Sequence, residues 1–212
     1  MGDYLQGLNE TLVMVGVSSF FSIAIGLPLG IVLVLTHPDG IASRPRLYRI
    51  MDVIINLFRS FPFIILIVVF RPLSELLTGR SSGTPAMTVS LTLSAIPFIA
   101  RIMETSINEV GTGVIEAALA MGTSIPRLIT KVLVPESLPA LIKGMTTTVI
   151  NIIGYSAMAG VVGGGGLGDL AIRWGLYNRH TEKLVVAVLM IVALVQIVQL
   201  LGNALSRAID HR

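Results

Sequence analysis

The stretch TLVMVGVSSFFSIAIGLPLGIVLVL, residues 11–35, contains no charged side chain in 25 consecutive positions. About 20 apolar residues are enough for a helix to cross a hydrocarbon layer ~30 Å thick. A second uncharged run, residues 184–206, is also long enough. Of all 212 residues, 53% are hydrophobic and 13% are charged, which does not fit a water-facing domain. The sequence therefore predicts an all-α membrane protein.

Three weaker apolar stretches raise the number of predicted spans to five. One of them contains Arg59, and the last is rich in Thr, Gly and Ser. The connections between the spans are short and leave no room for a separate soluble domain. We therefore expect residues 1–212 to form a single transmembrane domain. Its spans are expected at about 11–35, 50–70, 84–103, 145–162 and 184–206, with a cytoplasmic loop at about 104–137.

The basic residues predict the orientation of these spans. Alternate loops fall into two groups, which hold nine and five Lys and Arg residues. Because basic residues favour the cytoplasmic side, we expect the N-terminus outside and the C-terminus in the cytoplasm. The N-terminal region lacks a basic segment, and its apolar run exceeds the ~7 to 15 residues of a signal-peptide core. The first helix is therefore expected to be retained.

The composition also argues against several classes of function. The chain has no cysteine, so it has no thiolate nucleophile, disulfide or cysteine-based metal site. A formal net charge of +3 agrees with the excess of Lys and Arg in one group of loops. It gives no reason to infer nucleic-acid binding.

The stretch VIEAALAMGTSIP, residues 114–126, lies in the long cytoplasmic loop, and no charge separates Glu116 from Arg127. Its pattern predicts two short helices joined at Gly122. On the first, Ile115, Leu119 and Gly122 share one stripe. For the second, the sequence predicts a cap at Thr123 or Ser124, Pro126 in the first turn, and an end at Pro135 and Pro139.

Two interpretations of these apolar helices are open. They can lie on the bilayer surface, but such helices usually carry Lys and Arg on one face and bulky anchors on the other. Small residues with charges at the rim instead favour insertion into a groove of another protein.

The segment EAALAMGTSIPRLITKVLVP, residues 116–135, resembles the EAA loop of bacterial ABC importer permeases. Val132 and Val134 stand where that family usually has Ile and Leu. In the family, this loop forms a coupling helix that docks into a cleft of a separate ATPase subunit. The resemblance implies that the docking residues are Glu116, Ala117, Ala118, Leu119, Met121, Gly122 and Arg127.

Three further segments resemble the methionine importers of this family: NLFRSFPFIILIVV, AIPFIARIMETSINEVGTGVIEAALAMG and IIGYSAMAGVVGGGGLGDLA. The resemblance implies a type I ABC importer fold and a homodimer in a bacterial inner membrane. It also implies two ATPase subunits that carry ATP and Mg²⁺, an external methionine-binding protein or lipoprotein, and no cofactor on this chain. The expected function is import of methionine, including both stereoisomers. Permeases for quaternary ammonium osmoprotectants are the rival within the same class.

A homodimer is also expected on physical grounds. Five helices barely enclose a path for a polar solute, whereas two copies around a two-fold axis provide ten helices and a central lumen.

Arg59 interrupts an apolar span, where a charge is costly and faces protein or water. We expect it to pair with Asn56 or with an acid such as Glu104. Contact with the solute is the alternative.

The segment GYSAMAG, residues 154–160, raises the question of a serine nucleophile. Its fifth residue is Met158 rather than Gly, and the three histidines lie outside the predicted spans. Without a nearby base or metal cluster, a membrane enzyme is not expected. Tyr155, Ser156 and Met158 are instead predicted to line the lumen, with packing between helices as the alternative for Met158.

The segment VVGGGGLGDL contains a formal GxGxxG at Gly163, Gly165 and Gly168. It follows a membrane helix rather than a strand, so nucleotide binding is not expected. The glycines instead predict a sharp bend before an external loop that faces the binding protein. Trp174 and Tyr177 in this loop suit the membrane interface.

Overall fold

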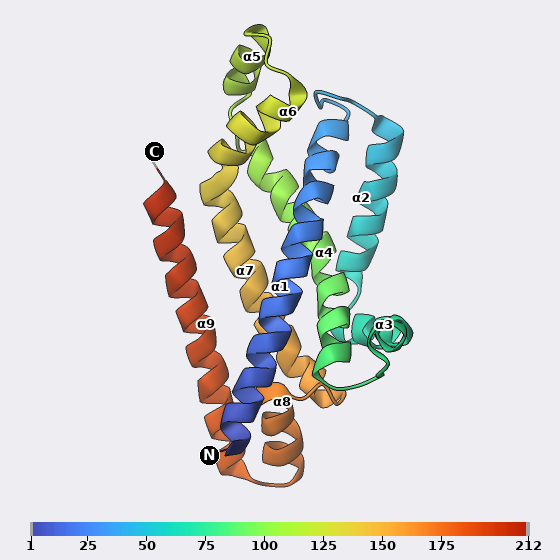
Figure 1. Ribbon diagram of the computed structural model, residues 1–212, viewed down its shortest axis with the longest axis vertical. Helices are drawn as coiled ribbons and strands as arrows, with labels where there is room; N and C mark the ends of the chain where they lie inside the picture. Colours follow the sequence, from blue (N-terminus) through green and yellow to red (C-terminus); the bar gives the residue numbers. More distant parts are fainter. Residues whose placement is uncertain (1, 211–212) are drawn as a thin grey trace.

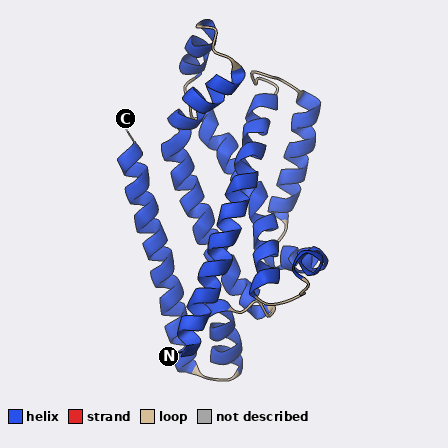
Figure 2. Cartoon of the chain, viewed as in Figure 1, coloured by secondary structure: helices blue, strands red, loops and turns tan. Residues whose placement is uncertain are grey.

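The computed structural model describes residues 2–210, so Met1, His211 and Arg212 lie outside the described part. Within residues 2–210 every regular element is a helix, and the connecting loops are short (Figure 2). The elements are α1 (Gly2–Thr36), α2 (Pro45–Ser60), α3 (Phe63–Thr78), α4 (Thr84–Asn108), α5 (Thr112–Ala120), α6 (Ile125–Leu128), the π-helical segment η1 (Ile129–Leu133), α7 (Val134–Val161), α8 (Gly166–Asp169), the π-helical segment η2 (Leu170–Tyr177) and α9 (Thr181–Ile209).

The centre of the bundle is the pair α1 and α4, which lie against each other along their lengths (Figure 1). Small residues at every fourth position of α1 form the contact: Ser18, Ser22, Gly26 and Gly30. The two serine hydroxyls each donate a 3.0 Å hydrogen bond to carbonyls of α4. The two glycines leave room for Ile99 and Met103. Small residues at this spacing allow close approach of helix backbones, as is usual inside membranes.

The second predicted span is broken into two helices. α2 and α3 meet at an angle of 110° around Phe61 and Pro62. Phe61 adopts an extended conformation, with φ −76° and ψ 137°, because a following proline disfavours the α region. The range predicted as one span, 50–70, therefore covers parts of two helices that run in different directions.

The prediction that Pro135 and Pro139 end the helix after Gly122 is wrong. The helical path continues from Ile125 to Val161, through a widened turn in which the Val134 N–H donates to the carbonyl of Ile129. Such π-type turns insert an extra residue and change the local hydrogen-bond pattern. Pro135 follows this turn directly. Proline has no backbone N–H to donate, and the altered hydrogen-bond pattern of the turn accommodates this missing donor.

The glycine-rich segment forms a tight turn, as predicted. Gly163, Gly165 and Gly166 have positive φ angles, and the helices on either side are bent by 47°. The Glu10 carboxylate accepts a 2.7 Å hydrogen bond from the Gly166 N–H, and the Thr11 hydroxyl accepts one from the next amide. The start of α1 is therefore fixed to this turn.

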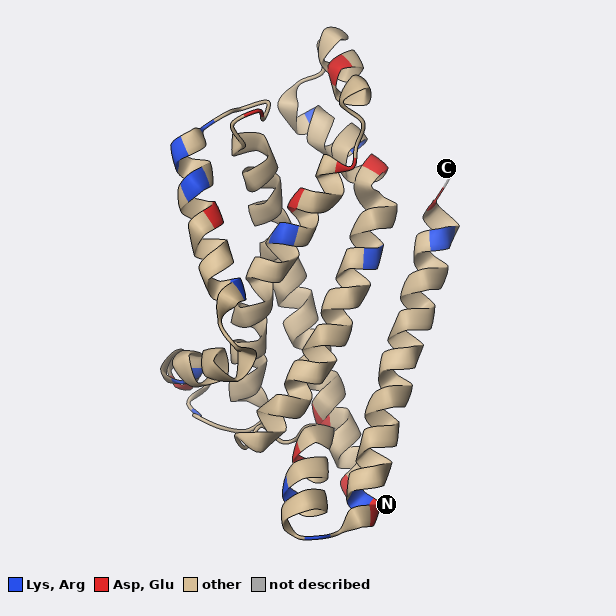
Figure 3. Cartoon of the chain, turned by 180° about the vertical axis from the view of Figure 1, so that it is seen from behind, with Lys and Arg blue, Asp and Glu red and all other residues tan. Residues whose placement is uncertain are grey.

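By length and composition, α1, α4 and α9 are unbroken helices that can cross a membrane, and the two bent pairs bring the number to five if each is one crossing. Only 6% of the most apolar window of α9 is buried within the chain, which leaves its surface free for lipid or a neighbour. Lys, Arg, Asp and Glu gather near the two ends of the bundle, with further charges along α2 and on α3, α4 and α7 (Figure 3).

Candidate functional site

α5 and α6 lie at one end of the bundle, where α5 extends beyond the ends of α1 and α2 and α6 leads into α7 (Figure 1). The turn between them follows from Gly122, whose φ is +76°. Its N–H donates a 2.9 Å hydrogen bond to Leu119, and the next amide donates to Ala118. A Cβ at this position would meet nothing within 4 Å, so the left-handed backbone alone explains the glycine. The predicted turn at Gly122 between two helices is confirmed, but only the first helix is short, because the second continues into α7.

The coupling segment, as we call residues 112–128, is anchored on one side to the chain's own core. Ala118 and Leu128 are buried in a cluster with Ile107 and Leu133, and Ile115 packs against it. Ala118 is 4% exposed, so it anchors α5 and does not present a surface for another protein. Ser124 occupies the predicted cap position, but its side chain forms no capping hydrogen bond.

The other side of the coupling segment faces outward. Glu116, Ala117, Gly122 and Arg127 are exposed, and Leu119 and Met121 expose 38% and 80% of their surface. Within residues 2–210, neither Glu116 nor Arg127 forms an ion pair or a side-chain hydrogen bond. Apolar side chains flanked by unpaired charges are typical of a protein interface.

A groove of about 420 Å³ runs beside α5 and the turn between α1 and α2. Its walls include Ile115 and Leu119 on one side and His37 and Ile41 on the other. The exposed face of the coupling segment is therefore continuous with a mostly apolar depression.

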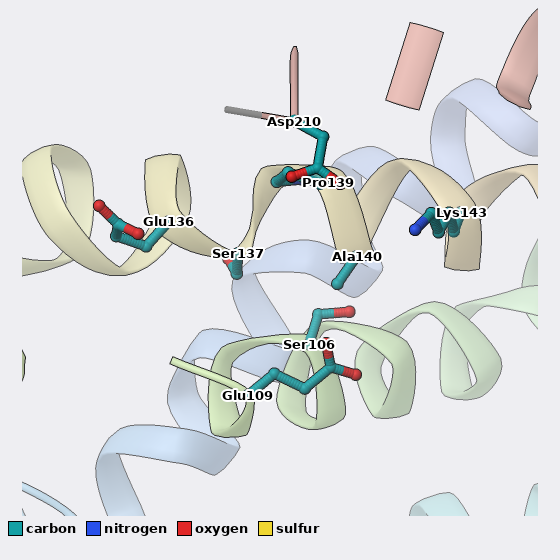
Figure 4. A pocket seen from close by; sticks show the side chains of 8 residues that line it. All are labelled: Ser106, Glu109, Glu136, Ser137, Pro139, Ala140, Lys143 and Asp210. Atoms are coloured by element: carbon teal, nitrogen blue, oxygen red, sulfur yellow. The ribbon is translucent and has the colours of Figure 1, made fainter. Parts of the chain in front are cut away.

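A second pocket, of about 330 Å³, lies nearby, between the end of α4 and the start of α7 (Figure 4). Carboxylates from three elements line it, namely Glu109, Glu136 and Asp210, together with Lys143. Among residues 2–210, no group of three His, Asp or Glu side chains is arranged to hold a metal ion. The pocket therefore adds negative charge next to the coupling segment.

The three residues predicted to line a pathway do not share one surface. Ser156 is 2% exposed, and its hydroxyl donates a 2.7 Å hydrogen bond to the carbonyl of Ile153. Tyr155 stacks on Phe63 of α3, with ring centroids 4.0 Å apart. Met158 is 47% exposed. Of the three, Met158 is the side chain free to meet a solute or a second copy.

The expected pairing of Arg59 with Asn56 or Glu104 is wrong. The guanidinium lies 5.5 Å from the ring centre of Phe98, and within residues 2–210 it forms no ion pair. Asn56 and Glu104 are both held by Arg101 instead. The partners were assigned to the wrong arginine because the sequence does not show which faces of α2 and α4 meet.

The sequence reasoning did not identify the network around Arg101. Its guanidinium forms ion pairs with Asp52 of α2 and Glu104 of α4, and the Tyr48 hydroxyl donates a 3.1 Å hydrogen bond to Glu104. Glu104 is 3% exposed. The sequence feature that could have revealed this network is the spacing of Arg101 and Glu104. They are three residues apart inside an apolar helix, which places both on one face.

The fold and the exposed coupling segment define a membrane permease whose surface is built to meet another protein. Residues 17–212 match the family described as binding-protein-dependent transport system inner membrane components. The chain belongs to this family, and it is a transport subunit rather than an enzyme.

The relatives narrow this class further. The chain is 44% identical over 203 residues to the probable D-methionine transport system permease protein MetI of Vibrio cholerae, covering 96% of this chain and 90% of the relative. It is 47% identical over 156 residues to the D-methionine transport system permease protein MetI of Escherichia coli K12, covering 74% and 72%.

Solved structures agree with this fold. An inward-facing structure of the MetNI methionine ABC transporter matches with a TM-score of 0.97 and 42% identity, over 100% of this chain and 98% of the other. An amino acid ABC transporter with histidines matches with a TM-score of 0.75 over 97% and 93%, and at 19% identity it shows the fold alone. The prediction of an all-helical ABC importer permease is confirmed.

Proposed function

We propose that this chain is the membrane-spanning subunit of an ATP-driven importer for methionine. The relatives named for D-methionine transport and the inward-facing methionine transporter support this substrate. They favour methionine over the quaternary ammonium compounds considered as a rival. D-methionine in the relatives' names supports acceptance of that stereoisomer, with L-methionine as the second expected substrate.

The coupling segment carries the proposal for mechanism. Its outward face combines exposed apolar side chains with the unpaired charges of Glu116 and Arg127. In the proposed complex this face docks onto a separate ATPase that holds ATP and Mg²⁺, and the groove beside α5 widens the contact. Ala118, Leu128 and the π-helical turn connect the face rigidly to α4 and α7. ATP binding then moves α4 and α7 as units, so that the lumen opens alternately to the two sides of the membrane.

The proposed assembly contains two copies of residues 1–212, each acting as one domain with five crossings. The bent pairs α2 with α3 and α7 with α8 each count as one crossing in this arrangement. The coupling segment and the C-terminus face the cytoplasm, and the N-terminus and the glycine-rich turn face the external binding protein. Lipid covers the exposed apolar face of α9.

The docking role is tested with Glu116→Arg and Gly122→Leu in the full complex reconstituted in vesicles with its binding protein. Both changes should reduce methionine uptake at least tenfold, because a reversed charge or a strained turn prevents productive docking. Copurification of the ATPase and the ratio of ATP hydrolysed to methionine accumulated are measured alongside. Glu75→Arg is the matched control, because Glu75 is an exposed acid of α3, outside the coupling segment and outside the turn that faces the binding protein.

Wild-type uptake in both coupling variants refutes the docking role. Accumulation of a quaternary ammonium solute in place of methionine by the unaltered complex would instead support the rival substrate.

A further inference from the structure

α2 carries polar side chains along one face, although it belongs to a helix pair long and apolar enough to cross a membrane. Arg49, Asp52, Asn56 and Arg59 recur at intervals of three and four residues, which places them on one side of the helix. We call these four residues the polar stripe of α2. All except Asp52 are exposed. Because exposed polar groups are not tolerated against lipid tails, this face fits a water-filled space.

Charges along the polar stripe are balanced at its centre, but within residues 2–210 neither Arg49 nor Arg59, at its two ends, forms an ion pair. Asp52 pairs with Arg101, and Asn56 accepts a 3.0 Å hydrogen bond from the same guanidinium. Arg59, one turn further on, has no carboxylate partner within residues 2–210. The inner end of the stripe therefore presents a positive charge that is free to attract an anion.

The contact with Phe98 leaves the hydrogen-bonding edge of Arg59 available. A guanidinium 5.5 Å from a ring centre is within range of a cation–π interaction, which neutralises no charge and occupies no N–H donor. Arginine carries five N–H donors in one plane, in a fork that matches the two oxygens of a carboxylate. The ring thus holds the charge in place, and the donors stay free.

Arg59 also lies where the chain changes direction inside the membrane. About 21 Å of helix separates it from Pro45 at the start of α2, and the 110° bend follows directly. Phe63, just past the bend, stacks on Tyr155 of α7, and exposed Met158 lies one turn beyond Tyr155. Because α2 and α7 run in the same direction (Figure 1), Arg59 lies before the Phe63–Tyr155 contact and Met158 lies beyond it.

We propose that Arg59 binds the α-carboxylate of the amino acid during its passage through the lumen. This inference rests on the proposed function, and it identifies Arg59 as a polar contact for the solute along the transport pathway. The carboxylate is then recognised at Arg59, and the exposed side chain of Met158 lies further along the bundle. A solute without a carboxylate forms no such ion pair with Arg59.

The test uses the absence of cysteine from this chain. Arg59→Cys, in a complex whose partners lack reactive cysteines, is reacted with water-soluble thiol reagents that attach a cationic aminoethyl or an anionic sulfonatoethyl group. Arg59→Cys and Arg59→Gln should each reduce methionine uptake at least tenfold, with assembly and ATP hydrolysis without solute unchanged. The cationic reagent should restore uptake at least threefold, and the anionic reagent should not. Arg46→Cys is the control, an exposed arginine of α2 outside the polar stripe.

Four results overturn the inference. They are uptake by Arg59→Gln within twofold of wild type, equal responses to the two reagents, failure of Arg59→Cys to react, and loss of assembly in both variants, which would assign Arg59 to packing. In each case the unaltered complex still accumulates methionine. Absence of methionine uptake by the unaltered complex refutes the proposed function itself.

Discussion

Arg101 shows how one side chain can fix the relation between two helices inside the bundle. It pairs with Asp52 on α2 and Glu104 on α4, and Tyr48 of α2 adds a hydrogen bond to Glu104. These groups are largely removed from water, so each charge depends on its partner. The network joins α2, with its polar stripe, to the helix that leads into the coupling segment.

Replacement of Arg101 by Met should destabilise the protein by about 3 kcal/mol, because it leaves two partly buried carboxylates without a cation. The thermal unfolding midpoint of the purified complex measures the loss. Arg46→Met, at an exposed position of α2 outside this network, should change stability by less than ~0.5 kcal/mol. A double variant, Arg101→Met with Glu104→Met, should recover part of the loss. Equal midpoints for the two single variants would show that the network contributes no stability.

Ser156 and Met158 should respond differently to truncation, although they lie two residues apart. Ser156→Ala removes a hydroxyl that donates to its own helix, so we expect uptake within about twofold of wild type, since such local bonds add little. Met158→Ala removes an exposed thioether, and we expect a changed uptake rate or a passive leak with normal assembly. Initial rates in vesicles measure both. Unchanged kinetics in Met158→Ala would assign Met158 to packing.

At the level of elements, the contact between α1 and α4 depends on the absence of side chains. A Cβ on Gly30 would overlap Met103, and one on Gly26 would lie 2.5 Å from the Cβ of Ile99. Ser18 and Ser22 continue this face and add hydrogen bonds to the backbone of α4. Because apolar helices gain little from burial in lipid, close packing supplies much of their association.

Gly30→Leu should therefore separate α1 from α4 and lower the stability of the complex by about 1–3 kcal/mol, the usual cost of overpacking. Gly16→Leu is the matched control, because a Cβ at Gly16 meets nothing within 4 Å. Thermal unfolding and the yield of monodisperse complex distinguish the two variants. Similar losses in both would show that the α1–α4 contact is not the cause, because leucine favours a helix more than glycine does.

The elements that the sequence predicts well are those set by local rules. The long helices over 11–35 and 184–206 follow from the length of the uncharged runs, the helix over 84–103 follows from a weaker apolar stretch, and the turn at Gly122 follows from its neighbours. The 110° bend at Pro62 and the continuous helix through Pro135 depend on how the freed backbone groups find partners in the bundle. The partners of Arg59 and Arg101 depend on which helix faces meet, and hydropathy carries no such information.

At the scale of the whole molecule, charge divides the bundle into a centre and two ends. The coupling segment, the start of α2 and the end of α9 gather at one end, and the start of α1 and the glycine-rich turn gather at the other (Figure 1). Charged residues concentrate at these ends, and α2 and α4 carry further charges toward the centre, where Asp52 pairs with Arg101 (Figure 3). In the proposed pathway, a solute that crosses between the ends meets the charges of α2 on its way.

The orientation of these two ends leads to a prediction that thiol labelling can check. Gln6, Asn178 and Arg207 are all exposed. The first two lie at the end with the glycine-rich turn, and Arg207 lies in the last turn of α9. Each is changed separately to Cys in this cysteine-free chain. A membrane-impermeant maleimide applied to spheroplasts should label Gln6→Cys and Asn178→Cys, whereas Arg207→Cys should react only after the membrane is permeabilised, because nine of the basic residues belong on the cytoplasmic side. The reverse pattern would invert the proposed orientation, and labelling of Gln6→Cys and Asn178→Cys from opposite sides would contradict an odd number of crossings.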